Sequence, residues 1–103
     1  MRAKVKSGIC GFVAAIDAKS EDMQHVTIAL DSDCPNVQRL QGLLGTIDAF
    51  SELGTKFDGE IHSASKAAKL CNAGCPIPAA LHKVTQVAAG LALPGDASIE
   101  FEK

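Results

Sequence analysis

Residues 24–31 have the sequence Gln-His-Val-Thr-Ile-Ala-Leu-Asp, and this stretch decides the fold class. Val26, Ile28 and Leu30 share one face of an extended chain. Thr27 lies on the opposite face, so the apolar and polar positions alternate with period two. That alternation predicts a half-buried strand, which is typical of an antiparallel sheet with one face on a core and one face in water.

An earlier extended region precedes this strand, over residues 2–18. Gly8 and Gly11 interrupt it, and we expect the two glycines to break or bend the strand. Residues 20–22 (Ser-Glu-Asp) are typical of a turn. The extended regions on either side of this turn are therefore expected to pair as an antiparallel hairpin.

Helical patterns dominate the rest of the chain. Pro35 suits the first position of a helix, and Gly45 is expected to end that helix. Residues 46–60 are mixed and suggest a short helical turn, while the Ala- and Lys-rich residues 63–70 predict a further helix. Residues 76–91 predict a stronger helix. Its expected core face consists of Ile77, Ala80, Leu81, Val84, Val87 and Ala88.

Residues 97–102 alternate as Ala-Ser-Ile-Glu-Phe-Glu, which predicts a final strand with Ile99 and Phe101 facing inward. The resulting fold class is α+β: a small antiparallel sheet packed on one side by helices. With 103 residues, the chain is expected to form a single four-cysteine domain over residues 1–103.

The overall composition argues against several kinds of partner. Ten basic and 12 acidic residues give a net charge of −2, without a basic run that would favour nucleic acid. Four Phe without Trp or Tyr offer few stacking platforms for bases. No stretch approaches the roughly 20 apolar residues of a membrane span, so we expect neither nucleic acid nor a membrane as a partner. The composition does not indicate an oligomeric state.

The N-terminal residues loosely mimic a secretory signal, because Arg2, Lys4 and Lys6 precede the apolar run 9–16. The run is short, and no small-x-small cleavage site follows it before Asp17. The region is better interpreted as a strand, and a cytoplasmic location is expected.

Four cysteines, Cys10, Cys34, Cys71 and Cys75, carry the functional argument. In a cytoplasmic chain they point to metal binding or redox chemistry rather than to a disulfide framework. All four fall at the ends of expected elements or beside glycines, whereas structural cysteines are usually buried inside an element. Four thiolates can hold an iron–sulfur cluster or a Zn²⁺ ion. We therefore predict a metal-thiolate binding module, most favourably for an iron–sulfur cluster.

Two of these cysteines precede proline, in Cys34-Pro35 and Cys75-Pro76. Each is expected to cap a helix, where the N–H groups and the helix dipole would favour the thiolate and lower the pKa of the thiol. Three residues separate Cys71 from Cys75. Zinc ribbons normally use two tight C-x2-C turns, so the spacing instead suits a site assembled from separate elements around one end of the sheet.

Other interpretations stay open at this stage. Cys71 and Cys75 could cycle between dithiol and disulfide in a thiol redox protein, with Cys75 as nucleophile. The domain could instead be a structural zinc module, with His25, His62 or His82 joining three cysteines. The Cys-Pro pairs also resemble haem-regulatory motifs, and the four cysteines could share no site at all. Because no catalytic triad, phosphate loop or dinucleotide motif is present, the sequence favours a binding module over an enzyme.

The order of the cysteines resembles iron–sulfur cluster scaffolds of the NifU/IscU type. In those proteins one cysteine precedes a strand as Cys-Gly, one lies between a strand and a helix, and one precedes a long late helix. Cys10-Gly11, Cys34 and Cys75 occupy similar places, with Phe12 where the scaffolds carry an aspartate associated with cluster release. The resemblance implies a protein partner for cluster transfer, with Cys71 as a fourth ligand.

The chain also resembles an uncharacterised domain-of-unknown-function family of short four-cysteine proteins from anaerobes. Four segments carry this resemblance: residues 7–12, 32–36, 75–78 and 88–94. It implies no established activity, although oxygen-poor cells would make an exposed cluster easier to keep.

Overall fold

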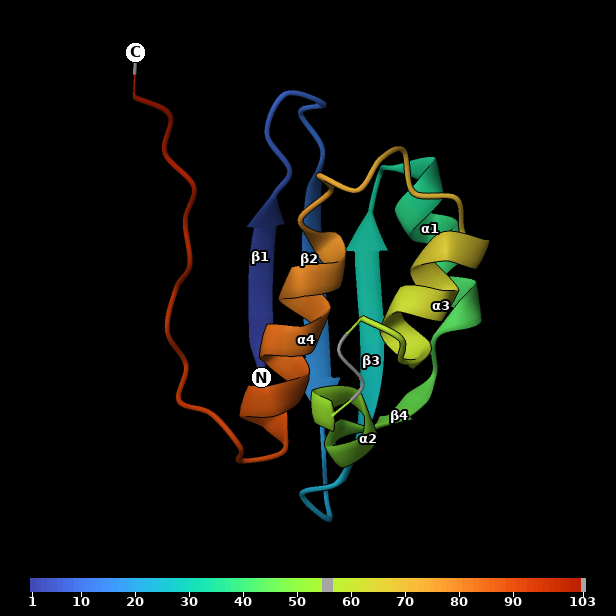
Figure 1. The fold of residues 1–103 in the computed structure, drawn as a ribbon, viewed down its shortest axis with the longest axis vertical. Coiled ribbons are helices and arrows are strands. Elements are labelled where there is room, and N and C mark those ends of the chain that lie inside the picture. Colours follow the sequence, from blue (N-terminus) through green and yellow to red (C-terminus); the bar gives the residue numbers. More distant parts are fainter. Residues whose placement is uncertain (55–56, 103) are drawn as a thin grey trace.

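The computed structural model describes residues 1–54 and 57–102. Its elements, in chain order, are β1 (Arg2–Lys6), β2 (Val13–Lys19), β3 (His25–Ser32), α1 (Pro35–Leu43), β4 (Thr46–Asp48), α2 (Ala49–Gly54), α3 (Glu60–Ala67) and α4 (Ile77–Ala88). The strands form one antiparallel sheet in the order β1-β2-β3-β4, and the helices pack on one face of it (Figure 1). The α+β class expected from the sequence is confirmed.

The alternation along β2 and β3 places the core between the sheet and the helices. On β3, Val26 and Ile28 are buried while Thr27 is exposed, as the sequence pattern predicts. On β2, Ile16 lies at the centre of the buried face. The largest fully buried side chains are Ile16, Val26, Leu40, Ile47, Ile61, Ile77, Leu81 and Thr85. The four phenylalanines all lie outside this core, with Phe50, Phe57 and Phe101 exposed and Phe12 half-buried.

The chain reverses direction between β1 and β2. The sequence predicted one interrupted strand over residues 2–18, but residues 7–12 form a tight connection between two strands. Gly8 and Gly11 have φ angles of +91° and +78°, in the region that side chains disfavour. The Gly11 N–H donates to the Gly8 carbonyl at 2.9 Å, which closes the turn. The two glycines therefore reverse the strand instead of bending it.

The turn between β2 and β3 confirms the expected hairpin. The Asp22 carboxylate accepts the backbone N–H groups of Gln24 at 3.0 Å and His25 at 2.8 Å. Its second oxygen lies 2.7 Å from Nδ1 of the exposed His25 ring. One side chain therefore ties together the backbone of the turn and the start of β3.

The helices differ from their predicted bounds at several ends. α1 begins at Pro35 as expected, and it ends at Leu43 with Leu44 as its C-cap, so Gly45 directly follows the end of the helix as predicted. Residues 46–48 then form β4, an edge strand too short for its pattern to be recognised, and α2 follows directly. α3 lies three residues earlier than predicted, and Lys69 at φ +57° turns the chain away after it. Residues 55 and 56 of the mixed stretch lie outside the described residues.

The predicted final strand is wrong. Residues 97–102 have no regular structure, and Ile99 and Phe101 are 85% and 86% exposed. The helix before them also ends early, at Ala88, because the chain turns at Gly90 with φ +75°. Alternation makes a strand only where another strand accepts its hydrogen bonds, and the segment pairs with none of the described strands. None of the described helices is long and apolar enough to cross a membrane.

We expect Leu81→Ala to lower the free energy of unfolding by about 2–5 kcal/mol, because it leaves a cavity between α4 and the sheet. Leu81 is fully buried, whereas Leu93 is 91% exposed. Leu93→Ala is therefore the matched control and is expected to change the stability by no more than about 0.5 kcal/mol. Urea unfolding followed by far-ultraviolet circular dichroism measures both. Equal effects of the two substitutions would contradict the position of α4.

Candidate functional site

The register of the sheet brings two of the cysteines to one end of the molecule. Lys6 pairs with Val13, so the connection that carries the exposed Cys10 projects from this end of β1 and β2. Ala14 pairs with Ser32, so β3 ends beside the start of β2. Cys34 lies two residues after the end of β3 and is the N-cap residue of α1. The β1–β2 connection and the β3–α1 junction are therefore neighbours.

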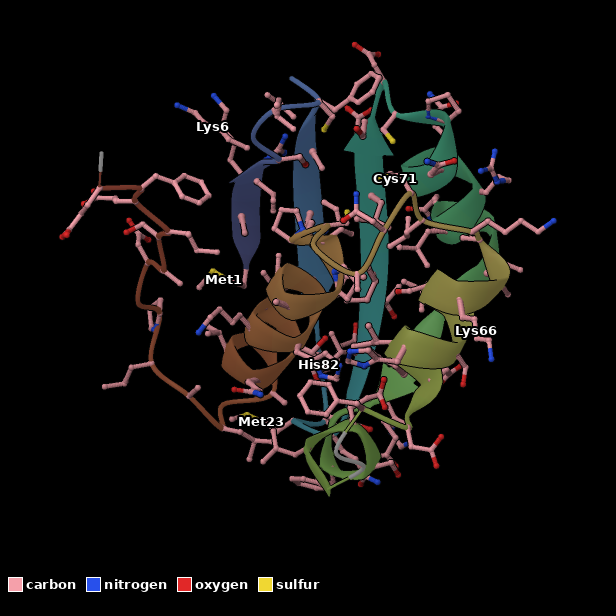
Figure 2. The ribbon with its side chains drawn as sticks, turned by 45° about the horizontal axis from the view of Figure 1, so that its top comes forward. Met1, Lys6, Met23, Lys66, Cys71 and His82 are labelled. Carbon is pink, nitrogen blue, oxygen red and sulfur yellow. The ribbon has the colours of Figure 1, made fainter. Side chains whose placement is uncertain are left out.

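The direction of α4 brings the other two cysteines to the same end. Gly90, just after α4, packs against Met23 in the β2–β3 turn, which lies at the opposite end of the sheet. The start of α4 at Ile77 is consequently at the cysteine end (Figure 1). The α3–α4 connection, which holds Cys71 and Cys75, crosses this end, and Figure 2 shows Cys71 there. All four cysteines thus occupy three connections at one end of the sheet.

The electrostatics of Cys75 reflect this proximity. Burial raises the pKa of the Cys75 thiol above its ordinary value, and the backbone N–H of Ile77 opposes the rise by hydrogen bonding to the sulfur. The charges of Cys71, Cys34 and Cys10 raise the pKa further, so each of them lies within electrostatic range of Cys75. The expected low pKa of Cys75 is therefore wrong, because burial and neighbouring sulfurs outweigh the start of the helix.

The two Cys-Pro segments also differ in their local geometry. Cys34 is the N-cap of α1 as predicted, although its side chain makes no capping hydrogen bond. Its N–H donates to Ser32 Oγ at 3.2 Å, and that hydroxyl donates to the Val13 carbonyl at 3.0 Å, which ties Cys34 to β2. For α4 the N-cap is Pro76, so Cys75 lies one residue before the predicted position.

The four cysteines differ in exposure. Cys34 and Cys75 are half-buried against the hydrophobic core, while Cys10 and Cys71 are exposed. All four are free thiols. Across residues 1–54 and 57–102, no three side chains of His, Cys, Asp or Glu are already arranged as ligands of one metal ion.

A groove of about 890 Å³ begins beside Cys75 and runs between α2, α3 and α4. Inside it, His82 Nε2 lies 3.1 Å from His62 Nδ1, and the Phe57 and His62 rings pack in a T-shaped arrangement with centroids 5.3 Å apart. Figure 2 shows His82 on the side of α4 that faces α3. The sequence suggested His62 and His82 only as separate candidate ligands and did not predict that they form a pair. A signal existed, because each histidine directly follows a fully buried residue, Ile61 or Leu81.

Glu52 also lines this groove, and the sequence did not indicate it as a candidate. Its side chain is buried, and its two oxygens accept the backbone N–H groups of Glu60 at 3.0 Å and Ile61 at 2.5 Å. These N–H groups belong to the first turn of α3, where no carbonyl within the helix can accept them. Glu52 therefore joins α2 to the start of α3 and has a structural role.

We expect His82 to titrate below 6.5 and His25 above it. Burial, followed by the nearby charge of His62, lowers the pKa of His82, although Glu52 opposes this, whereas the Asp22 hydrogen bond raises the pKa of His25. Below pH 6.5, His82 therefore binds more protons in the unfolded chain than in the folded protein. Its contribution to stability is lost as the pH falls through that range. The contribution of His25 has the opposite sign: it is present below 6.5 and is lost as the pH rises through its raised pKa.

Imidazole proton shifts recorded by NMR against pH measure both values. Asp22→Asn is the matched control, since it should return the pKa of His25 toward 6.5 and leave that of His82 unchanged. A His82 pKa above that of His25 would contradict the burial of the histidine pair.

Comparison with known proteins places the chain in a family without assigning an activity. Residues 1–101 match the family model described as a family of unknown function (DUF6951). No curated protein and no solved structure shows a significant match. The match covers nearly the whole chain, and this protein therefore belongs to the DUF6951 family.

Proposed function

We propose that the protein is a binding module that holds or carries an iron–sulfur cluster through Cys10, Cys34, Cys71 and Cys75. One observation supports this above the others: three connections far apart in the sequence bring all four cysteines to one end of the sheet. Sixty-five positions separate the first from the last of these residues. Thiolates from separate loops are a ligand set that suits iron–sulfur clusters.

The unequal exposure of the cysteines supports a cluster that is half-buried. Cys34 and Cys75 would hold its inner side against the core. Cys10 and Cys71 would hold its outer side, where the loops are exposed. Transfer of a cluster to a protein partner requires an exposed side on the cluster. The cysteine end of the sheet therefore suits a protein that carries a cluster as well as one that stores it.

The order of Cys10, Cys34 and Cys75 along the chain also resembles that of cluster scaffolds of the NifU/IscU type. Phe12 stands where those scaffolds carry aspartate, which favours holding a cluster over rapid release. Two exposed ligands would leave the cluster open to oxygen, so we propose that the protein works in the cytoplasm of an oxygen-poor cell. Binding would displace the thiol protons, and the affinity for the metal should therefore rise with pH.

Anaerobic purification followed by absorption spectroscopy and analysis of iron, sulfide and zinc tests the proposal. We expect a coloured protein that contains iron and sulfide. The chain has no Trp or Tyr, so its own near-ultraviolet absorption is very weak and any chromophore is easily seen. Cys34→Ser and Cys75→Ser should each reduce the bound iron severalfold, because each removes an inner ligand.

Asp33→Asn is the matched control, since it changes an exposed side chain beside Cys34 and leaves every sulfur in place. It should keep the full iron content. A colourless protein with stoichiometric zinc would identify a structural zinc domain instead. Protein without metal, but with a reversible disulfide between Cys71 and Cys75 after alkylation and mass spectrometry, would identify a thiol redox protein.

A further inference from the structure

One edge of the sheet lacks a partner strand within the described chain. β1 is the first strand in the sheet order and pairs only with β2. Its outer edge therefore presents backbone N–H and C=O groups that another strand could use. This edge carries positive charge on the open face of the sheet, because Lys4 and Lys6 lie opposite the uncharged Ala15 and Val13. Two such edges repel each other, so the charge favours a strand of opposite sign.

Residues 97–102 form a strand-like segment of that opposite sign. Glu100 and Glu102 alternate with Ile99 and Phe101. Both apolar side chains are more than four-fifths exposed, at 85% and 86%, and every residue from 91 to 102 is exposed. The segment thus combines exposed apolar side chains with two acidic side chains that alternate with them.

The alternating charged and apolar side chains of β1 match those of residues 97–102 when the two segments are paired as strands. Side chains opposite each other on paired strands lie on the same face of a sheet. If Glu100 and Glu102 face Lys4 and Lys6, then Ile99 and Phe101 fall on the helix side. Ala3 and Val5 lie on that side, and Ala3 is only partly covered. In an antiparallel pairing, Glu100 lies opposite Lys6 and Glu102 opposite Lys4, which places Phe101 opposite Val5 and Ile99 opposite Ser7, just beyond the end of β1. This register pairs the opposite charges and also covers the exposed Phe101 ring.

The direction of the segment decides which β1 strand it pairs with. Figure 1 shows residues 91–102 running past β1 of their own sheet in the same direction as β1. Pairing within the chain would therefore be parallel, which is the less stable arrangement, and the structure contains no such pairing. A second copy related by a two-fold axis can present its β1 in the antiparallel direction. Residues 91–96 connect α4 to this segment and span about 20 Å when extended.

We propose that residues 97–102 of each chain add as a strand to the β1 edge of a second copy, which forms a reciprocal dimer. Each exchange extends a four-stranded sheet to five strands. The interaction is isologous, because each copy offers one acidic segment and one basic edge. It is independent of the cysteines, which lie on the connections at one end of the sheet.

Two charge-reversed chains test this proposal by mixing. The first carries Glu100→Lys and Glu102→Lys, and the second carries Lys4→Glu and Lys6→Glu. Each chain alone has a segment and an edge of the same sign, so its dimer dissociation constant should rise about tenfold or more. An equimolar mixture should restore the dimer, since both exchanged pairs then have opposite signs. Analytical ultracentrifugation measures the three samples and the unaltered protein.

Circular dichroism confirms that each chain is folded, and Leu93→Lys is the control for a general effect of exposed apolar groups. It lies outside the pairing segment and should leave the dimer unchanged. Two results would overturn the proposal: an unaltered protein that stays monomeric at all concentrations, or a mixture no more associated than its components. Monomers with slow amide exchange across residues 97–102 would show pairing within one chain, which also overturns it.

Discussion

The packing of α4 along the central strand β2 is the contact on which the rest of the structure depends. β2 presents Ala14, Ile16 and Ala18 to the helix, and the two alanines leave room for it to lie close to the strand. The 12 residues of α4 rise about 18 Å, and the seven residues of β2 extend about 23 Å. The helix therefore spans most of the length of β2, and its two ends lie at opposite ends of that strand. One end carries the cysteine connection, while the other meets Met23.

Much of the fold followed from local patterns, and its errors have specific physical causes. The alternation of β3 and the position of Pro35 needed no tertiary information. Gly8 and Gly11 were recognised as an interruption, but a bend and a reversal require similar glycines, and only pairing with a neighbouring strand distinguishes them. β4 has three residues, too few for a periodic pattern. Residues 97–102 show the converse, since they have the pattern of a strand but pair with no strand among the described residues.

The candidate site was predictable in kind but not in geometry. The sequence identified the four cysteines, whereas their common position depends on the pairing of Ala14 with Ser32 and on the direction of α4. Neither of these is encoded in the spacing between cysteines. Burial of Cys75 is likewise a product of packing, which is why the helix start alone predicted the wrong direction for its pKa. The histidine pair arises because two helices bring residues 20 positions apart within hydrogen-bonding distance.

Because no phenylalanine lies in the core, the phenylalanine rings can report on binding events outside the core. Phe12 closes the connection that carries Cys10, Phe57 lines the groove, and Phe101 lies in the acidic segment. The described interior is purely aliphatic apart from Thr85, Ser65 and Glu52. The phenylalanine proton signals of this protein therefore come from outside the core, and these three rings belong to different parts of the molecule. A ligand, a metal or a second chain would change the spectrum of one ring and thereby identify where it binds.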